Sequence, residues 1–168
     1  DLSLMPQVPS LQRVRGTLQF SETGLVLQGV QARLLGGDAR LEGGLRWTPS
    51  THEPPLQLRI QGYASAEGLR QQREWQAGSR LWALMDGGAS YNAVMQWRQG
   101  LPDLMVTSSL QGLSWQAPAP LGKNADSTQA FRLEYGLAAD TRAAGAARGQ
   151  DQFLLAVGSV LKAQVVRD

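Results

Sequence analysis

The residues that most often carry enzymatic chemistry are sparse in this sequence. His52 is the single histidine, and it lies in the proline-rich loop Thr48–Pro55, with no G-x-S-x-G motif anywhere in the chain. A serine or histidine mechanism needs a nucleophile, a base and an orienting group within hydrogen-bond reach. We therefore interpret His52 as an ordinary solvated loop residue.

Gly122 and Lys123 resemble the end of a phosphate-binding loop, in which backbone amides and a lysine hold nucleotide phosphates. The first glycine of that motif would fall on Ala117, the Ser/Thr position holds Asn124, and two prolines lie between. Proline has no backbone N–H to offer a phosphate. The sequence therefore predicts no nucleotide loop here.

Glu67 and Glu74 could share one face of a helix, as the two carboxylates of a glycosidase must share a cleft. Solvated helix carboxylates are far commoner than catalytic pairs. The chain also contains no cysteine and no aspartate-rich loop, which removes thiol chemistry, disulfides and a calcium site. The sequence predicts a protein that is not an enzyme, with no catalytic residue, no cofactor and no metal site.

Composition limits the partners. The formal net charge is only +2, and the arginines are scattered from Arg13 to Arg167 without a basic run, which argues against nucleic-acid binding. No stretch approaches the roughly 20 consecutive apolar residues that a membrane helix needs. The chain begins at Asp1 without methionine. We expect residues 1–168 to form a single domain or segment, not itself membrane-spanning, of a longer protein.

Apolar and polar residues alternate along most of the chain, which is the period of a β-sheet with one dry face and one wet face. In residues 13–20 the alternation ends at Ser21–Gly24, a hairpin-turn sequence. Further alternating runs follow at residues 25–34, 39–47 and 56–61. The sequence predicts a four-stranded meander over residues 14–62.

The second run changes phase within itself. Leu25 and Leu27 begin in one phase, whereas Val30 and Leu34 end in the other. A phase change needs one extra residue, and a glycine inside a strand is the expected place for a β-bulge. We therefore predict a bulge at Gly29.

The period changes to that of a helix after the meander. Ser65 is a good N-cap and Glu67 suits the first turn, so a helical segment is expected near residues 65–85, running to about Gln76 and then continuing or restarting at Ser79. Asp86–Gly88 is expected to form a turn. Alternation resumes in a second strand group over residues 89–167, giving about nine strands in total.

About nine strands span on the order of 40 Å, and one short helix cannot cover such a face. The predicted fold is therefore mainly β: a curved, mostly antiparallel sheet with one apolar face, forming a trough or a half-open sandwich. The trough could hold an acyl chain. The residues expected to line it are the alternating apolar side chains Leu18, Phe20, Leu41, Leu45, Leu58, Ile60, Met95, Trp97, Val106, Leu133 and Tyr135.

Glycine and proline punctuation adds a family resemblance. Gly24–Ala39 resembles the hairpin that recurs in AsmA-like proteins. Gly62–Leu69, Asp86–Tyr91 and Asp103–Lys123, in this order and spacing, are similar to the YhdP family, which is related to TamB. The resemblance covers most of the chain from about residue 14 to residue 123, and its motifs are specific as a set rather than singly.

The resemblance implies a periplasmic protein whose parent chain is anchored in the inner membrane of a Gram-negative bacterium. It also implies an elongated β-groove involved in phospholipid transport between the inner and outer membranes and in outer-membrane integrity. The expected partners are phospholipid acyl chains and the rest of the parent chain. The family supplies no catalytic motif to carry over.

Two functions remain open at this point. One is a lipid-groove segment, and the other is a structural or interaction module with a closed β-sandwich core. Leu58, in the middle of its expected strand, separates them. In an open trough an arginine at this position could reach water along its stem, so we expect Leu58→Arg to stay folded and to lose lipid; in a closed core it would unfold the chain.

Overall fold

The structure, a computed structural model, describes residues 10–47, 55–72, 79–98, 101–137 and 151–167. Its strands form one ten-stranded antiparallel sheet, accompanied by two short helices. The elements in chain order are β1 (Gln12–Ser21), β2 (Gly24–Leu34), β3 (Gly37–Arg46), β4 (Leu56–Ser65), α1 (Ala66–Arg70), α2 (Ser79–Trp82), β5 (Met85–Arg98), β6 (Leu101–Ser108), β7 (Leu113–Trp115), β8 (Phe131–Leu137), β9 (Asp151–Val157) and β10 (Leu161–Arg167).

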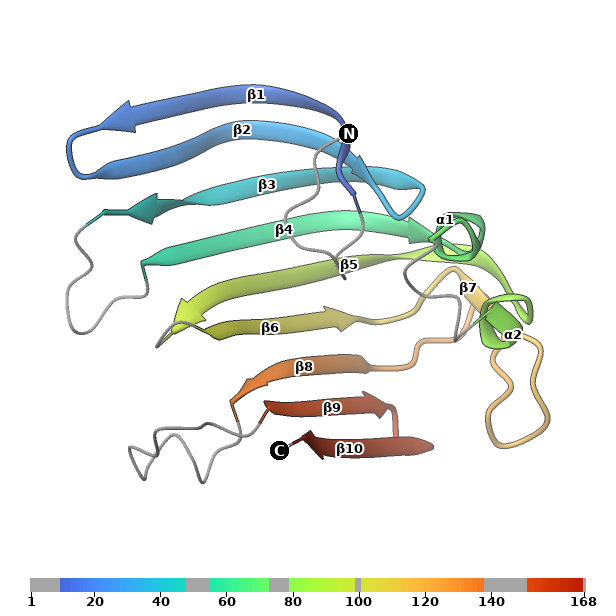
Figure 1. The fold of residues 1–168 in the computed structure, drawn as a ribbon. Helices are drawn as coiled ribbons and strands as arrows, with labels where there is room; N and C mark the ends of the chain where they lie inside the picture. The colour runs from blue at the N-terminus through green and yellow to red at the C-terminus, as the bar shows by residue number, and fades with distance from the viewer. Residues whose placement is uncertain (1–9, 48–54, 73–78, 99–100, 138–150, 168) are drawn as a thin grey trace.

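The sheet is an open, single layer. Its strands are ordered β1-β2-β3-β4-β5-β6-β8-β9-β10, with β7 pairing with β5 off this path. Figure 1 shows the layer from one side, with both helices at the end where β4 leads into β5. This confirms the predicted fold class, with ten strands rather than about nine. Over the described residues no second sheet covers either face, so the closed sandwich is not formed.

The bulge predicted at Gly29 is present. The register of β2 against β3 shifts between Leu27, which faces Gly43, and Val30, which faces Leu41. Gly29 has φ +57, in the left-handed region that favours glycine. The extra residue brings Leu27 and Val30 to the same face of the sheet, although they are three positions apart.

The helical segment is shorter than predicted. Ser65 is the N-cap, and its hydroxyl accepts a hydrogen bond from the backbone N–H of Gly68 at 3.0 Å. Helix α1 ends at Arg70, because the chain tightens there: the N–H of Gln72 bonds the carbonyl of Leu69 at 3.2 Å, a three-residue step. The expected continuation to Gln76 is wrong at residues 71–72, and residues 73–78 lie outside the described part. Helix α2 is separate.

The turn predicted at Asp86–Gly88 is wrong, because these residues belong to β5. Gly88 pairs with Ser65 of β4, and Gly87 pairs with Leu113 of β7. A Cβ on Gly87, whose φ is +79, would lie 2.3 Å from the carbonyl oxygen of Gly112. Glycine therefore serves close backbone approach here rather than chain reversal. The three-residue β7 is too short to show alternation in the sequence.

The buried residues form two clusters. The larger one lies on one face of β2 to β5 and consists of Leu11, Val30, Ala32, Leu34, Ala39, Leu41, Ile60, Tyr91 and Ala93. The smaller one joins α1, β5 and the start of β7 through Ala66, Ala89 and Leu113. The pairing of β4 with β5 places the two expected strand groups in the same sheet.

Candidate functional site

Cross-strand rows of apolar side chains form one face of the sheet. In an antiparallel sheet, residues opposite each other in the register project from the same face. Starting from Leu41, the register connects one apolar residue in each strand from β2 to β10 except β7. This row is Val30, Leu41, Ile60, Ala93, Val106, Leu133, Leu155 and Ala163. We call the surface that carries Leu41 the apolar face.

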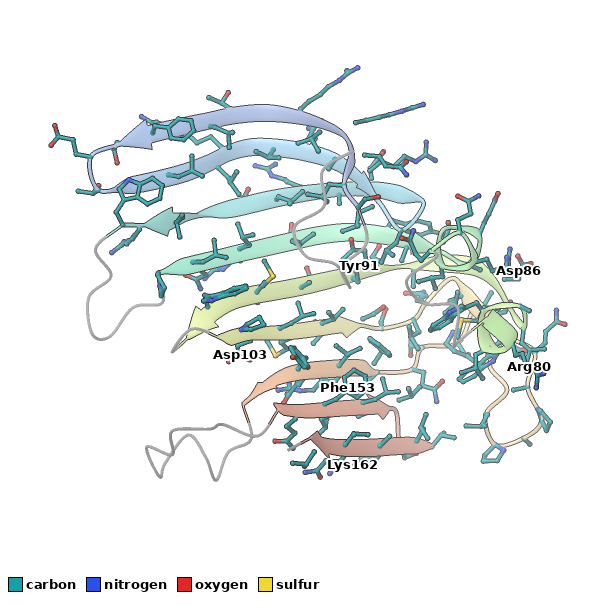
Figure 2. All side chains as sticks on the ribbon, viewed as in Figure 1. Arg80, Asp86, Tyr91, Asp103, Phe153 and Lys162 are labelled. Carbon is teal, nitrogen blue, oxygen red and sulfur yellow. The ribbon has the colours of Figure 1, made fainter. Side chains whose placement is uncertain are left out.

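A second row crosses the entire path from β1 to β10. It runs beside the first and contains Leu18, Leu27, Gly43, Leu58, Met95, Leu104, Tyr135, Phe153 and Val165. A shorter third row crosses β1 to β4 near the turn between β1 and β2. It contains Phe20, Leu25, Leu45 and Leu56. Figure 2 shows the side chains as sticks on the ribbon and labels Phe153 of the second row.

The residues predicted to line the trough all lie on the apolar face. Leu41, Ile60, Val106 and Leu133 belong to the first row. Leu18, Leu58, Met95 and Tyr135 belong to the second, and Phe20 and Leu45 to the third. Trp97 is two positions after Met95 on β5, so it projects from the same face. The alternation identified the face correctly.

Exposure differs between the middle and the margins of the apolar face. In the middle, Leu41 and Leu58 are only 2% and 5% exposed. At the outer strands, Phe20 of β1 is 69% exposed and Val165 of β10 is 57% exposed. Large apolar side chains are therefore in contact with water at both margins, on β1, β9 and β10. Contiguous exposed apolar patches are typical of surfaces that bind apolar partners. Periodicity in the sequence does not report this gradient.

The opposite surface, which we call the polar face, has different chemistry. Its central row is Arg15, Gln31, Arg40, Gln61, Asn92, Thr107, Arg132, Ala156 and Lys162. Two exposed ion pairs lie on this face, Arg40–Glu42 and Arg132–Glu134. A short strip of half-buried Val94, Met105 and Leu154 interrupts it. Apart from this strip and the exposed Val26, Tyr63 and Val166, the face is polar, so the two faces differ in chemistry along most of the sheet.

Tyr91 places a polar atom within the apolar cluster. Its side chain is 7% exposed, and its hydroxyl has no hydrogen-bond partner among the described residues. The ring lies across Gly62 of β4, where a Cβ would be 2.8 Å from the tyrosine oxygen. Burial raises the pKa of Tyr91 to about 12 because the phenolate would lose its hydration.

Sequence reasoning missed several residues of this surface. Tyr91 and Leu104 occupy the same face as the predicted set, as do Phe153 and Val165 at the far strands. All four follow the same period of two, and the alternation marks them as strand residues, but they were not among the residues expected to line the trough. Leu11 is different: it precedes β1, is 4% exposed and packs into the cluster, and no period marks it.

The residues considered for catalysis have structural roles or lie outside the described part. The Lys123 ammonium donates to the backbone carbonyls of Leu113 at 2.8 Å and Asn124 at 2.9 Å. Burial lowers the pKa of Lys123, and the carboxylate of Asp126 opposes that shift. Lys123 thus holds the loop after β7 rather than a phosphate. His52 and Glu74 lie outside the described residues.

Within the described part of the chain, no group of three or more potential ligands could hold a metal ion. Neither α1 nor α2 has the length or apolar character needed to cross a membrane.

Comparison with known proteins gives a family. The family described as YhdP protein matches residues 1–168. No curated protein and no solved structure matches the chain at a significant level. The family is not known for enzymatic activity, and it points to a bacterial envelope protein connected with lipid transport. Because the match spans the whole chain, the protein belongs to the YhdP family, consistent with the wider AsmA-like superfamily.

Proposed function

We propose that this chain is a non-catalytic lipid-handling segment whose apolar face binds the acyl chains of phospholipids. The observation that carries the proposal is the second cross-strand row, which runs from Leu18 to Val165 on one face. Each methylene transferred from water to such a surface contributes about 0.8 kcal/mol. Ten methylenes would contribute roughly 8 kcal/mol before the entropy lost on association, enough for reversible binding.

Membership of the family supports a cellular location for this binding. We infer a periplasmic location, a parent chain anchored in the inner membrane, and a role in phospholipid transport toward the outer membrane. An open sheet supports this role better than a closed module does, because a single layer leaves large apolar side chains in contact with water at both margins of the face. The arrangement of polar side chains on the opposite face supports contact with water on that side.

Two neighbouring residues of β1 test the proposal. Leu18 projects from the apolar face and Gln19 from the polar face, and both are exposed. The purified chain is extracted with organic solvent, and phospholipid is quantified by mass spectrometry. We expect lipid with the unmodified chain and with Gln19→Arg, and several-fold less with Leu18→Arg. Absence of lipid from the unmodified chain, or equal loss in both variants, would reject acyl-chain binding at this face.

A further inference from the structure

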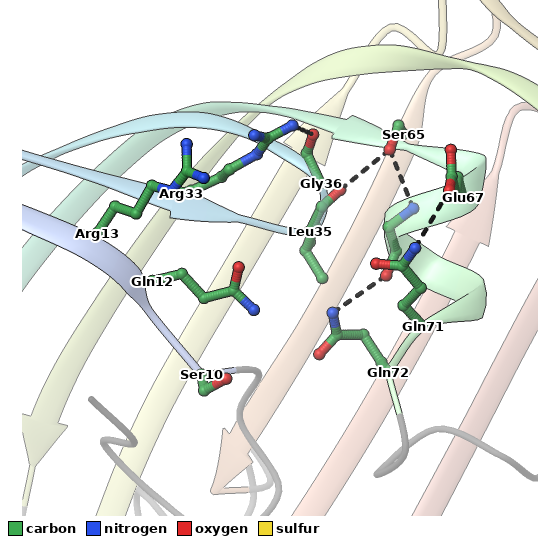
Figure 3. Close-up of a pocket in the computed structure, with 11 residues that line it drawn as sticks. Ser10, Gln12, Arg13, Arg33, Leu35, Gly36, Ser65, Glu67, Gln71 and Gln72 are labelled. Carbon is green, nitrogen blue, oxygen red and sulfur yellow. Dashed lines mark hydrogen bonds between the residues drawn. The ribbon is translucent and has the colours of Figure 1, made fainter. Parts of the chain in front are cut away.

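A polar pocket lies at the corner of the sheet where β1 begins. It is formed by the first residues of β1, the turn between β2 and β3, and helix α1, and its volume is about 290 Å³. Figure 3 shows Gln12, Arg13 and Arg33 on one side, and Gln71 and Gln72 of the α1 end on the other. The volume is near the lower end of small-molecule sites, ~300 Å³.

Two guanidinium groups lie at this pocket. Among the described residues, neither Arg13 nor Arg33 forms an ion pair. Arg33 donates one hydrogen bond, from Nη2 to the carbonyl of Gly36 at 3.3 Å, and keeps its other donors. Glu67, the one carboxylate among the described lining residues, accepts a hydrogen bond from Gln71 Nε2 at 3.2 Å. The lining therefore carries an excess of positive charge.

The backbone at Arg13 departs from regular strand geometry. Its φ is +52, in the left-handed region that a residue with a Cβ rarely adopts. The register of β1 against β2 shifts between Gln12 and Arg15, so Arg13 leaves the alternation of the strand. Such irregularities re-aim a side chain and concentrate at functional sites. Figure 3 shows the Arg13 and Arg33 side chains on the same side of the pocket.

The pocket lies at the edge of the sheet, where residues of the two faces alternate along the chain. Leu11 lies between the lining residues Ser10 and Gln12, and Leu34 lies between Arg33 and Leu35. Both leucines are buried in the cluster that occupies the apolar face. On β2, Arg33 lies two positions after Gln31 and so projects from the polar face, whereas Leu34 projects from the apolar face. Because β1 is an edge strand, a single ligand could reach both surfaces by passing round this edge, with its anionic part at the arginines and its apolar part on the sheet.

We propose that the pocket at Arg13 and Arg33 binds a phosphate group, and specifically the headgroup phosphate of a lipid whose acyl chains lie on the apolar face. The lipid part of this inference rests on the proposed function. Arginine suits the task because its planar fork donates paired hydrogen bonds to phosphate oxygens. The glutamine amides at the pocket supply further donors to the remaining oxygens.

The experiment measures binding of short-chain ligands to the full chain by isothermal titration calorimetry. The probes are dihexanoyl phosphatidic acid, dihexanoylglycerol with the same chains but no phosphate, and inorganic phosphate alone. We expect the unmodified chain to bind phosphatidic acid at least tenfold more tightly than dihexanoylglycerol. In the double variant Arg13→Gln/Arg33→Gln this preference should disappear, while the affinity for dihexanoylglycerol stays unchanged.

The matched control removes the same charge elsewhere. Arg15→Gln/Arg59→Gln changes two exposed arginines of the polar face and should keep the preference. A second variant, Arg13→Lys/Arg33→Lys, keeps the positive charge and should retain part of the preference for phosphatidic acid. Circular dichroism confirms that each variant is folded.

The outcomes separate the two proposals. If the unmodified chain shows no preference for phosphatidic acid, or if the control variant loses the preference equally, the pocket is not a phosphate site. Inorganic phosphate that binds as tightly as phosphatidic acid would assign the pocket to a free anion and overturn the headgroup. If dihexanoylglycerol fails to bind while phosphatidic acid still depends on Arg13 and Arg33, the acyl-chain function fails and the phosphate site stands.

Discussion

Leu58 of β4 and Val165 of β10 belong to the same cross-strand row of the apolar face, yet Leu58 is 5% exposed and Val165 is 57% exposed. The two side chains share a face and an apolar character, but only Leu58 is buried. The middle of the face therefore acts as the core of the protein, and the margins offer surface to a ligand. Substitutions in the middle should change stability, and substitutions at the margins should change binding.

The largest expected effect is that of Leu58→Arg. The sequence suggested that an arginine here could reach water in an open trough, but Leu58 is 5% exposed although the sheet is open, so we expect this variant to unfold and it no longer separates the two functions. A charge forced into the packed middle should lower the free energy of unfolding by several kcal/mol and abolish cooperative folding. Urea denaturation followed by circular dichroism measures this. Gln61→Arg, on the polar face of the same strand, should remain folded.

If Leu58→Arg lowers the free energy of unfolding no more than Gln61→Arg does, the middle of the face is not a core. The comparison between middle and margins would then be wrong.

The second effect concerns Tyr91 at alkaline pH. Burial raises its pKa to about 12 from the usual value near 10. Between these values the unfolded chain loses the phenolic proton and the folded chain keeps it, so the free energy of unfolding falls as pH rises. A two-unit difference amounts to about 2–3 kcal/mol, fully retained below pH ~10.

Tyr91→Phe provides the comparison, because other groups also titrate in this range. The variant should be as stable as the unmodified chain or more so at pH 8, since it removes a buried hydroxyl that has no partner in the described part of the chain. It should also lose less stability between pH 10 and 12. Denaturation curves at pH 8, 10 and 12 measure the free energy of unfolding of the two proteins. Parallel pH profiles for the two proteins would contradict a buried hydroxyl at this position.

The sequence predicted the face from which each side chain projects more accurately than it predicted how deeply that side chain is buried. Alternation depends only on the two-residue repeat of a strand, so Leu18, Ile60 and Tyr135 were placed correctly. Depth depends on what packs over each position, and Leu11 reaches the cluster from outside the strands. Its contribution could not be deduced from a repeat.

The local errors have a similar origin. Asp86–Gly88 reads as a turn, because glycine pairs usually mark chain reversal. In the structure the same glycines allow the backbones of β4 and β7 to approach β5 closely. Whether glycine serves a turn or a close approach is decided by a partner strand distant in sequence. The polar pocket at Arg13 escaped prediction for the same reason, since its walls come from three separate elements.

A smaller effect is expected at the bulge that joins the margin to the middle. Gly29 has φ +57 and open space where a Cβ would lie, so the backbone conformation alone limits substitution. Gly29→Ala should lower the free energy of unfolding by about 1 kcal/mol, and Gly29→Asn by less, because asparagine tolerates the left-handed region. Thermal denaturation distinguishes the two. An alanine variant more stable than the asparagine variant would show that strain at this residue does not set the register.

The smallest effect on stability, and the sharpest on function, should come from Val165 and Val166 of β10. These neighbouring valines are 57% and 46% exposed and project from opposite faces, Val165 opposite Phe153 on the apolar face and Val166 opposite Gln152 on the polar face. Exposed substitutions away from special features usually change stability by less than about 0.5 kcal/mol. Val165→Arg and Val166→Arg should therefore have similar melting temperatures, while only Val165→Arg binds dihexanoylglycerol several-fold more weakly. Because residue type, strand and exposure are nearly matched, the face is the variable that differs. Equal binding by the two variants would mean that acyl chains do not reach β10, and the ligand surface would then be limited to the margin formed by β1 and β2.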